Sequence, residues 1–129
     1  MIISKRALNE LSAKAKLSPR LRLNLDLRNS NKDNSQRMLN ALEPGTVIPI
    51  HRHKDTNETC VCVRGHFEEY IYDEDGNLME TIDMYPGGPI LNIEAGQWHS
   101  LKCLESGTII LEAKDGAYRP LEEDEIMNV

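Results

Sequence analysis

The sequence has few cysteines, no long apolar run and few positive charges, and each shortage excludes a class of protein. Its three cysteines do not make an even framework of disulfides. No run near the N-terminus has the basic, apolar and small-residue order of a signal peptide. The apolar stretches are only a few residues long, whereas a membrane span requires roughly twenty. We therefore expect a soluble protein of the reducing cytoplasm, without membrane contact.

Positive charge is in the minority along this chain. It has 15 Lys and Arg residues against 21 Asp and Glu residues, which gives a formal net charge of −6. Because nucleic-acid affinity comes mostly from clustered Lys and Arg, we expect no nucleic-acid partner. The charge is also asymmetric, since most basic side chains lie in the first forty residues and residues 121–129 are acidic. We expect this acidic C-terminal tail to be solvated.

The N-terminal part of the chain predicts one helix followed by one strand. Residues 4–16 have the spacing of an amphipathic helix, capped by Ser4, whose apolar face holds Ala7, Leu8, Leu11 and Ala15. Pro19 disfavours the helical conformation at Ser18, so the helix should end there. The next residues alternate in the period of a strand, with every second position apolar: Leu21, Leu23, Leu25 and Leu27.

The remainder of the chain predicts an antiparallel barrel or sandwich. From Gln36 onward, short apolar segments are separated by turn residues at regular intervals. Asp75-Gly76 and Gly107 each lie between two such segments, which predicts two hairpins. A chain of 129 residues is too short for two separate cores. We therefore expect a helix and strand in residues 1–35 packed on a barrel of residues 36–120, followed by the tail of residues 121–129.

Four side chains have the spacing of a metal site. His51 and His53 point to the same face if they lie on a strand, because strand side chains alternate. A turn through residues 54–57 would bring Glu58 beside them, and Gly96 would allow the tight entry of a distant strand that carries His99. Imidazole nitrogens and a carboxylate oxygen are common ligands of divalent transition metals.

These residues resemble the two motifs of the cupin superfamily. The first motif, G-x5-H-x-H-x3,4-E-x6-G, is matched at every fixed position by Gly45, His51, His53, Glu58 and Gly65. The chain differs from the second motif, G-x5-P-x-G-x2-H-x3-N, at Glu94 and Cys103, and matches it at Gly88, Gly96 and His99. The resemblance implies an all-β double-stranded β-helix, the cupin or jelly-roll barrel, with an added N-terminal amphipathic helix. It also implies the metal ligands His51, His53, Glu58 and His99.

A closer resemblance covers nearly the whole chain. It rests on residues 36–46 (QRMLNALEPGT), the His51-Arg52-His53 step, residues 86–88 (PGG) and residues 111–120 (LEAKDGAYRP). These segments look like the WbuC family of cupin-fold metalloproteins. Members of that family are often encoded among genes for O-antigen and other surface-polysaccharide sugars. The resemblance implies a role in lipopolysaccharide biosynthesis and leaves the reaction open.

The expected cofactor is one divalent transition-metal ion. Three imidazoles and one carboxylate suit Fe, Mn, Ni, Co, Cu or Zn, so the ligand set does not choose among them. The alternative is a barrel that kept these residues and binds no metal. The three cysteines, Cys60, Cys62 and Cys103, share the strand parity of Glu58 or His99 and should point into the barrel as buried, inert thiols.

Three arginines are candidates for binding an anionic ligand: Arg20, Arg22 and Arg37. A guanidinium matches the geometry of phosphate, and the first two stand on one face of the leucine-rich strand. The alternative is a solvated strand face that carries charge for solubility. We expect Arg52 to point away from the metal, and Tyr118 to cover a mouth of the barrel.

Three functions fit the sequence. The first is an enzyme that acts on a phosphorylated or nucleotide-linked sugar, by isomerisation or epimerisation, with the metal polarising an oxygen of the substrate. The second is an Fe(II)-dependent dioxygenase of a small substrate. The third is a non-catalytic module that binds a small molecule. No catalytic residue is identified, although one strand carries four candidates that can face the pocket: Glu68, Glu69, Tyr70 and Tyr72.

The N-terminal leucines also predict self-association. The strand of residues 21–27 and the preceding helix offer more apolar surface than a minimal barrel needs. We therefore expect a two-fold homodimer. If this strand paired with the neighbouring barrel, it would also cover an exposed sheet edge.

Overall fold

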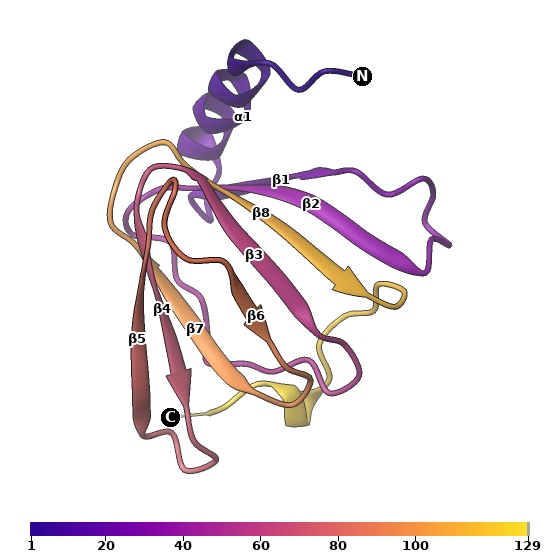
Figure 1. Cartoon of the computed structure of the whole chain (residues 1–129), viewed down its shortest axis with the longest axis vertical. Helices are drawn as coiled ribbons and strands as arrows, with labels where there is room; N and C mark the ends of the chain where they lie inside the picture. The colour runs from indigo at the N-terminus through magenta and orange to yellow at the C-terminus, as the bar shows by residue number, and fades with distance from the viewer. Residues whose placement is uncertain (129) are drawn as a thin grey trace.

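The computed structural model describes residues 1–128 and confirms a mostly β architecture with an N-terminal helix (Figure 1). Its elements are, in chain order, α1 (Lys5–Leu17), β1 (Arg22–Asp26), β2 (Ser35–Leu42), β3 (Glu58–Arg64), β4 (Phe67–Tyr72), β5 (Leu78–Met84), β6 (Leu91–Ile93), β7 (Trp98–Cys103), β8 (Thr108–Asp115) and the 3-10 helix η1 (Glu123–Glu125). No helix in the described part of the chain is long and apolar enough to cross a membrane.

The strands form two antiparallel sheets that face each other, as in the predicted jelly roll. One sheet has the strand order β1-β2-β8-β3-β6, and the other has the order β5-β4-β7. Side chains from both sheets pack between them in a core of Leu42, Cys60, Cys62, Phe67, Met84, Cys103 and Ile110. The prediction that the cysteines are buried is confirmed, and their thiols are free.

Helix α1 has the limits that its capping residues predict. Ser4 Oγ accepts a hydrogen bond from the backbone N–H of Ala7 at 3.2 Å, which starts the helix. Ser18 is extended, as expected before Pro19, and so the helix ends at Leu17. Its apolar face packs on the larger sheet in a second cluster, made of Leu11, Ala15, Leu39, Ala41 and Ile109 with Leu8, Leu23, Leu25 and Leu27 against it.

The leucines of β1 do not form the free apolar surface that the sequence predicts. Leu23 and Leu25 pack in the cluster that α1 covers within the same chain, so this argument for a homodimer is wrong. What β1 leaves unpaired is its backbone edge, because it is the outermost strand of its sheet. A two-fold homodimer stays a prediction, with that edge as its expected contact surface.

One of the two predicted hairpins is wrong. Asp75-Gly76 joins β4 to β5, which pair with each other as expected. Gly107 instead joins β7 to β8, and these two strands lie in different sheets. The chain therefore crosses from one sheet to the other at this turn. A short glycine turn supports either path, and the packing of the two sheets decides between them.

Hydrogen bonds of the Arg64 side chain link α1 to the sheets. Its guanidinium donates hydrogen bonds to Asn9 Oδ1 at 2.7 Å, Ser12 Oγ at 2.9 Å and Leu8 O at 3.1 Å, and also to Gly107 O at 3.1 Å. One side chain thus satisfies acceptors on the helix and on the β7–β8 turn. The docking of the helix and the position of that turn depend on the same group.

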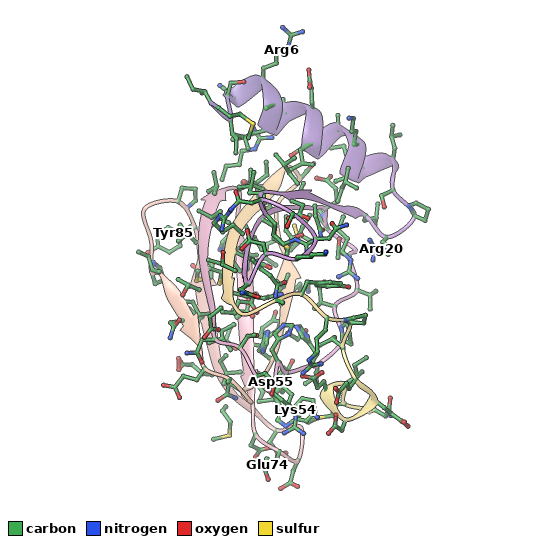
Figure 2. All side chains as sticks on the ribbon, turned by 90° about the vertical axis from the view of Figure 1, so that its right-hand side faces the viewer. Arg6, Arg20, Lys54, Asp55, Glu74 and Tyr85 are labelled. Atoms are coloured by element: carbon green, nitrogen blue, oxygen red, sulfur yellow. The ribbon has the colours of Figure 1, made fainter. Side chains whose placement is uncertain are left out.

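We predict that Arg64→Ala lowers the free energy of unfolding by about 2–4 kcal/mol, because each of its hydrogen bonds contributes about 0.5–1.5 kcal/mol. Urea unfolding measures the change. Arg6→Ala is the control, since Arg6 lies at the outer end of α1 with its side chain directed away from the sheets (Figure 2) and pairs with Glu10 at 3.5 Å. The control should change stability by less than about 0.5 kcal/mol. Equal effects of the two variants would contradict a fastening role for Arg64.

Candidate metal centre

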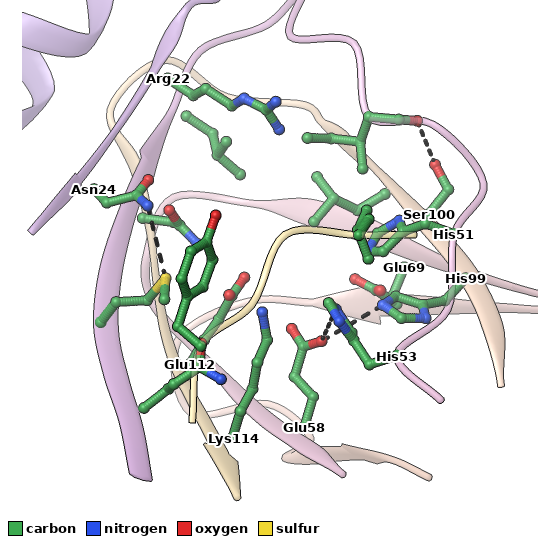
Figure 3. Close-up of a pocket in the computed structure, with 18 of the residues that line it drawn as sticks. Arg22, Asn24, His51, His53, Glu58, Glu69, His99, Ser100, Glu112 and Lys114 are labelled. Atoms are coloured by element: carbon green, nitrogen blue, oxygen red, sulfur yellow. Dashed lines mark hydrogen bonds and ion pairs between the residues drawn. The ribbon is translucent and has the colours of Figure 1, made fainter. Parts of the chain in front are cut away.

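A cavity of about 250 Å³ is bounded by strands of both sheets and by the segments that carry the histidines (Figure 3). All four predicted metal ligands line it. Its polar lining also includes Asn24, Gln36, Asn40, Glu69, Ser100, Glu112 and Lys114. The predicted ligands therefore meet at one end of a polar chamber.

His51 and His99 are held side by side by their own backbones. His51 N donates to His99 O at 3.0 Å, and His99 N donates to His51 O at 2.8 Å. Gly96 N donates to His53 O at 2.8 Å, and this glycine has φ of 86°, which supports its predicted role as a tight entry to β7. The segment of His51 and His53 is an isolated bridge and not a full strand, which differs from the prediction.

The three imidazoles converge on one point. The His51 and His99 ring centroids are 4.2 Å apart, and His53 lies at 5.2 Å and 5.8 Å from them. One nitrogen from each ring can be chosen so that all three nitrogens lie within 4.8 Å of one another. The group of His51, His53 and His99 can therefore hold a metal ion.

Backbone carbonyls orient two of these rings. His51 Nδ1 is 2.9 Å from Pro49 O, and His99 Nδ1 is 2.9 Å from Gln97 O. A carbonyl only accepts, so Nδ1 carries the proton and Nε2 presents a lone pair in the neutral ring. This carbonyl-to-imidazole contact is the usual support of a metal-binding histidine.

Glu58 completes the group. It begins β3 with 6% of its surface exposed, and its Oε2 lies 3.5 Å from both His53 Nε2 and His99 Nε2. Within the described residues, Glu58 Oε2 and His99 Nε2 are buried and have no hydrogen-bond partner. Such atoms are costly unless something else satisfies them. Ligand atoms about 2.1 Å from a common ion are separated by about 3.0–3.4 Å. The two distances of 3.5 Å from Glu58 Oε2 to the histidine nitrogens are close to this value. The residues therefore fit a bound divalent ion.

The protonation states also suit a cation. Burial lowers the pKa of His51 to about 4, and burial together with the charge of Lys114 lowers the pKa of His53 to about 4. Burial by itself would raise the pKa of Glu58, but its contact with His99 and the charge of Lys114 lower it to about 2. Near neutral pH these histidines are neutral and Glu58 is a carboxylate, the forms that bind metal.

Two more carboxyl groups line the same cavity. Of the four candidates on β4, only Glu69 lines it, because Glu68, Tyr70 and Tyr72 have the opposite strand parity. Burial and the charge of Glu58 raise the pKa of Glu69 well above its usual range, and the same two causes raise the pKa of Glu112 to about 7.

Sequence reasoning missed Glu112. The available signal is its pairing with Cys60 of β3 and Met38 of β2, which puts it on the inward face. These pairings can be assigned only when the strand order of the sheet is known.

The predicted anion-binding arginines separate into two groups. Arg20 and Arg22 line the cavity, whereas Arg37 does not. Arg37 follows Gln36 on β2, so it points to the opposite face of the sheet. There its guanidinium donates to Ser35 Oγ at 2.7 Å and to Leu27 O at 3.0 Å. The structure does not support Arg37 as a ligand-binding residue of this cavity.

Arg52 and Tyr118 lie close to where they are expected. The Arg52 guanidinium lies 4.6 Å from the centroid of Trp98 and donates to Asp124 O at 3.1 Å, and Arg52 does not line the cavity that the histidines line. Tyr118 lines the first cavity and also a second one of about 330 Å³. It is 58% exposed, as a residue at a cavity mouth would be.

The C-terminal segment pairs with the segment that carries two histidines. Ile126 forms an antiparallel bridge with His51. Arg52 N donates to Glu125 O at 3.0 Å, and Met127 N donates to Ile50 O at 2.9 Å. The prediction of a solvated tail is therefore wrong for these residues. The tail pairs with the edge of this segment opposite to the one that pairs with His99, and this gives the tail a fixed place.

Glu125 is the centre of this contact, with no exposed surface. Its carboxylate accepts hydrogen bonds from Lys54 N at 2.8 Å and from the guanidinium of Arg119. Arg119 also donates to Asp55 at 2.9 Å, and Figure 2 shows Lys54 and Asp55 beside the yellow C-terminal turn. The hydrogen bonds from Arg119 lower the pKa of Glu125 below its ordinary value of 4.5, so the group stays charged.

Comparisons with known proteins support the fold. A family model described as "Domain of unknown function (DUF6016)" matches residues 3–84, which include His51, His53 and Glu58. None of the curated proteins matches the chain. Among solved structures, KdgF from Halomonas sp. is similar with a TM-score of 0.64 and 15% identity, over 79% of this chain and 85% of that one.

Two further solved structures are similar over one part of a longer chain. The capsular polysaccharide assembling protein CapF from Staphylococcus aureus has a TM-score of 0.59 and 18% identity, over 68% of this chain and 24% of its own. The E162A mutant of Bacillus subtilis oxalate decarboxylase OxdC has a TM-score of 0.55 and 27% identity, over 65% of this chain and 22% of its own. The chain therefore spans about a quarter of either protein. With these neighbours, the two facing sheets are the cupin fold.

We predict that Glu125→Gln lowers the free energy of unfolding by about 2 kcal/mol at pH 7, because hydrogen bonds to a charged acceptor are lost. The pKa of Glu125 is lowered by folding, so its contribution is present above pH 4.5 and is lost as the pH falls further. The gap between wild type and variant should therefore narrow on acidification in urea unfolding. Glu123→Gln, in the same turn and exposed, is the control. A gap that stays constant between pH 7 and pH 3 would contradict the assignment.

Proposed function

The chain belongs to the DUF6016 family, whose description names no activity, and we propose that it is a metal-binding cupin that acts on or binds a sugar-derived anionic ligand. The observation that carries the metal assignment is the pair of buried atoms without partners, Glu58 Oε2 and His99 Nε2. They belong to the group of four side chains that fits a divalent ion. When bound, such an ion supplies a Lewis acid that polarises a ligand oxygen.

Contacts within the chain give the four candidate ligands the orientation and the protonation state that metal binding requires. The two carbonyl contacts of His51 and His99 fix which ring nitrogen faces the ion. Burial keeps His51 and His53 neutral by lowering the pKa of each to about 4, so no proton competes with the metal near pH 7. Glu58 supplies the one fixed negative charge of the set.

The remainder of the cavity suits a ligand rich in hydroxyl groups. Amide side chains and hydroxyl or carboxyl groups that can both donate and accept line its wall: Asn24, Gln36, Asn40, Glu69, Ser100 and Glu112. Arg20 and Arg22 also line the cavity and can pair with a phosphate. This supports a phosphorylated or nucleotide-linked sugar. The resemblance to the WbuC family and the similarity to the capsular polysaccharide assembling protein support a place in surface-polysaccharide biosynthesis.

The donor set also favours one competing function. Three imidazoles and one carboxylate leave up to two positions of an octahedral ion open, which suits an Fe(II)-dependent dioxygenase. The polar wall and the two arginines argue for the sugar ligand instead. A non-catalytic binding module would use the same site without turnover.

The metal assignment predicts that His51→Ala and His99→Ala each lose most bound metal, because each removes one of four donors. Elemental analysis of protein purified from its own host measures the metal content. His66→Ala is the matched control, since His66 lies outside the cavity and pairs with Asp83. The chelated wild type should keep its β-sheet dichroism, because the core does not involve the metal ligands. Full metal occupancy in both ligand variants would refute the assignment.

The ligand assignment predicts selective stabilisation by a sugar phosphate or nucleotide sugar. At a hundred times its dissociation constant, a ligand raises the free energy of unfolding by about 2.7 kcal/mol, which a thermal-shift assay detects. Arg22→Met should remove most of this rise, while Arg37→Met should not, because Arg37 lies outside the cavity. If no such compound shifts the midpoint and Fe(II)-loaded protein consumes O₂ with a small thiol or diol, the dioxygenase is the better assignment. If neither response appears, the binding module is favoured.

A further inference from the structure

Lys114 places a cation on the inner wall of the cavity. It lies on β8 in register with Glu58 of β3 on one side and Gln36 of β2 on the other. It lines both the cavity of about 250 Å³ and the neighbouring one of about 330 Å³, and so does His53. Figure 3 shows its side chain extending into the cavity next to Glu58 and Glu112. Lys114 therefore stands beside the candidate metal ligands.

The ammonium group of Lys114 forms no ion pair within the described residues, although three carboxyl groups line the same cavity. Lys54, on the outside of the same site, pairs with both Glu122 and Asp124 at 3.0 Å and 2.8 Å. Of the three carboxyl groups of the cavity, Glu58 directs its Oε2 to the histidines, at 3.5 Å from both His53 Nε2 and His99 Nε2. An unpaired, half-buried cation is costly unless a ligand pairs with it.

We propose that Lys114 binds a carboxylate of the ligand, so that the ligand of this cavity is a hydroxy acid derived from a sugar, with its acid group held beside the metal site. This inference rests on the proposed function, and it adds the chemical class of the ligand group that lies beside the metal site. The carboxylate pairs with Lys114, and the neighbouring hydroxyl faces the three-histidine group and Glu112.

The charge of the cavity wall favours a carboxylate over a phosphate at this position. A lysine is a compact point charge, whereas the fork of an arginine matches phosphate. A phosphate carries about two negative charges near neutral pH, which is more than Lys114 balances by itself in a cavity that the carboxyl groups of Glu58, Glu69 and Glu112 also line. A carboxylate carries one charge, which Lys114 balances. A phosphate would find its partners at Arg20 and Arg22 instead.

The test uses four probes that differ only in their charged groups: D-glucitol, D-glucitol 6-phosphate, D-gluconate and 6-phospho-D-gluconate. Calorimetry measures their binding to metal-loaded wild type, Lys114→Met, Arg22→Met and the control Lys102→Met, whose lysine is exposed and lies outside both cavities. Metal content is measured in every sample. We expect each carboxylate probe to bind wild type at least about tenfold more tightly than its neutral counterpart, as a hydrogen bond between charged groups allows.

The variants separate this proposal from the proposed function. Lys114→Met should abolish the gain in affinity that the carboxylate gives, and should keep both the metal and the gain in affinity from the phosphate. Arg22→Met should abolish the gain from the phosphate, and should keep both the metal and the gain from the carboxylate. If the carboxylate gives no gain in wild type, or if Lys114→Met keeps that gain, the role of Lys114 is overturned. If Lys114→Met loses the phosphate gain instead, Lys114 is a phosphate contact and the proposed ligand class is wrong. Loss of metal or of all binding in wild type would overturn the proposed function itself.

Discussion

The pair of backbone hydrogen bonds between His51 and His99 is the constraint on which the site depends. It joins a segment outside the regular strands to β7, and it brings two imidazoles to a centroid separation of 4.2 Å. The other contacts of the site preserve this pairing. Gly96 N bonds to His53 O, and the C-terminal segment forms a bridge to the other edge of His51. A non-strand segment is thus held from two sides, which gives its side chains the fixed directions that ligand binding needs.

Burial sets the charge of the cavity. Ten ionisable side chains line the cavity: three His, three Glu, two Arg, one Lys and one Tyr. Desolvation disfavours every charged form, so His51 and His53 lose their protons readily and Glu69 and Glu112 keep theirs to higher pH. Of the three carboxyl groups of the cavity, Glu58 alone has a lowered pKa, because its contact with His99 and the charge of Lys114 outweigh its burial. The result is an ionised Glu58 beside the neutral imidazoles of His51 and His53, an arrangement that favours a divalent cation at this end of the cavity.

The four candidate metal ligands could be selected from the sequence, whereas most of the cavity wall could not. His51, His53, Glu58 and His99 stand in a spacing whose geometry follows from strand alternation and short turns. Glu112 and Lys114 are different, because they point inward from β8 while their apolar neighbour Leu111 is 37% exposed. Polarity alone would predict that Leu111 points inward and that Glu112 and Lys114 point to solvent. Its face is decided by its register with β2 and β3, which pairs Glu112 with Met38 and Cys60. Those partners lie far away in the chain, so no local pattern reveals them.

The sequence by itself determined the helix limits, the β character, the burial of the cysteines and the four candidate metal ligands, because capping, alternation and motif spacing are local properties. Tertiary structure decided the remainder. Packing of α1 on β1 covered the leucines that a sequence reading leaves exposed. The two-sheet arrangement turned the Gly107 turn into a crossing between sheets. Burial of Glu125 against Arg119 and Lys54 converted an acidic tail into a support for the histidine segment. These arrangements include contacts between residues distant in the chain, such as Ile109 against α1 and Lys54 N with the carboxylate of Glu125, which no local sequence window contains.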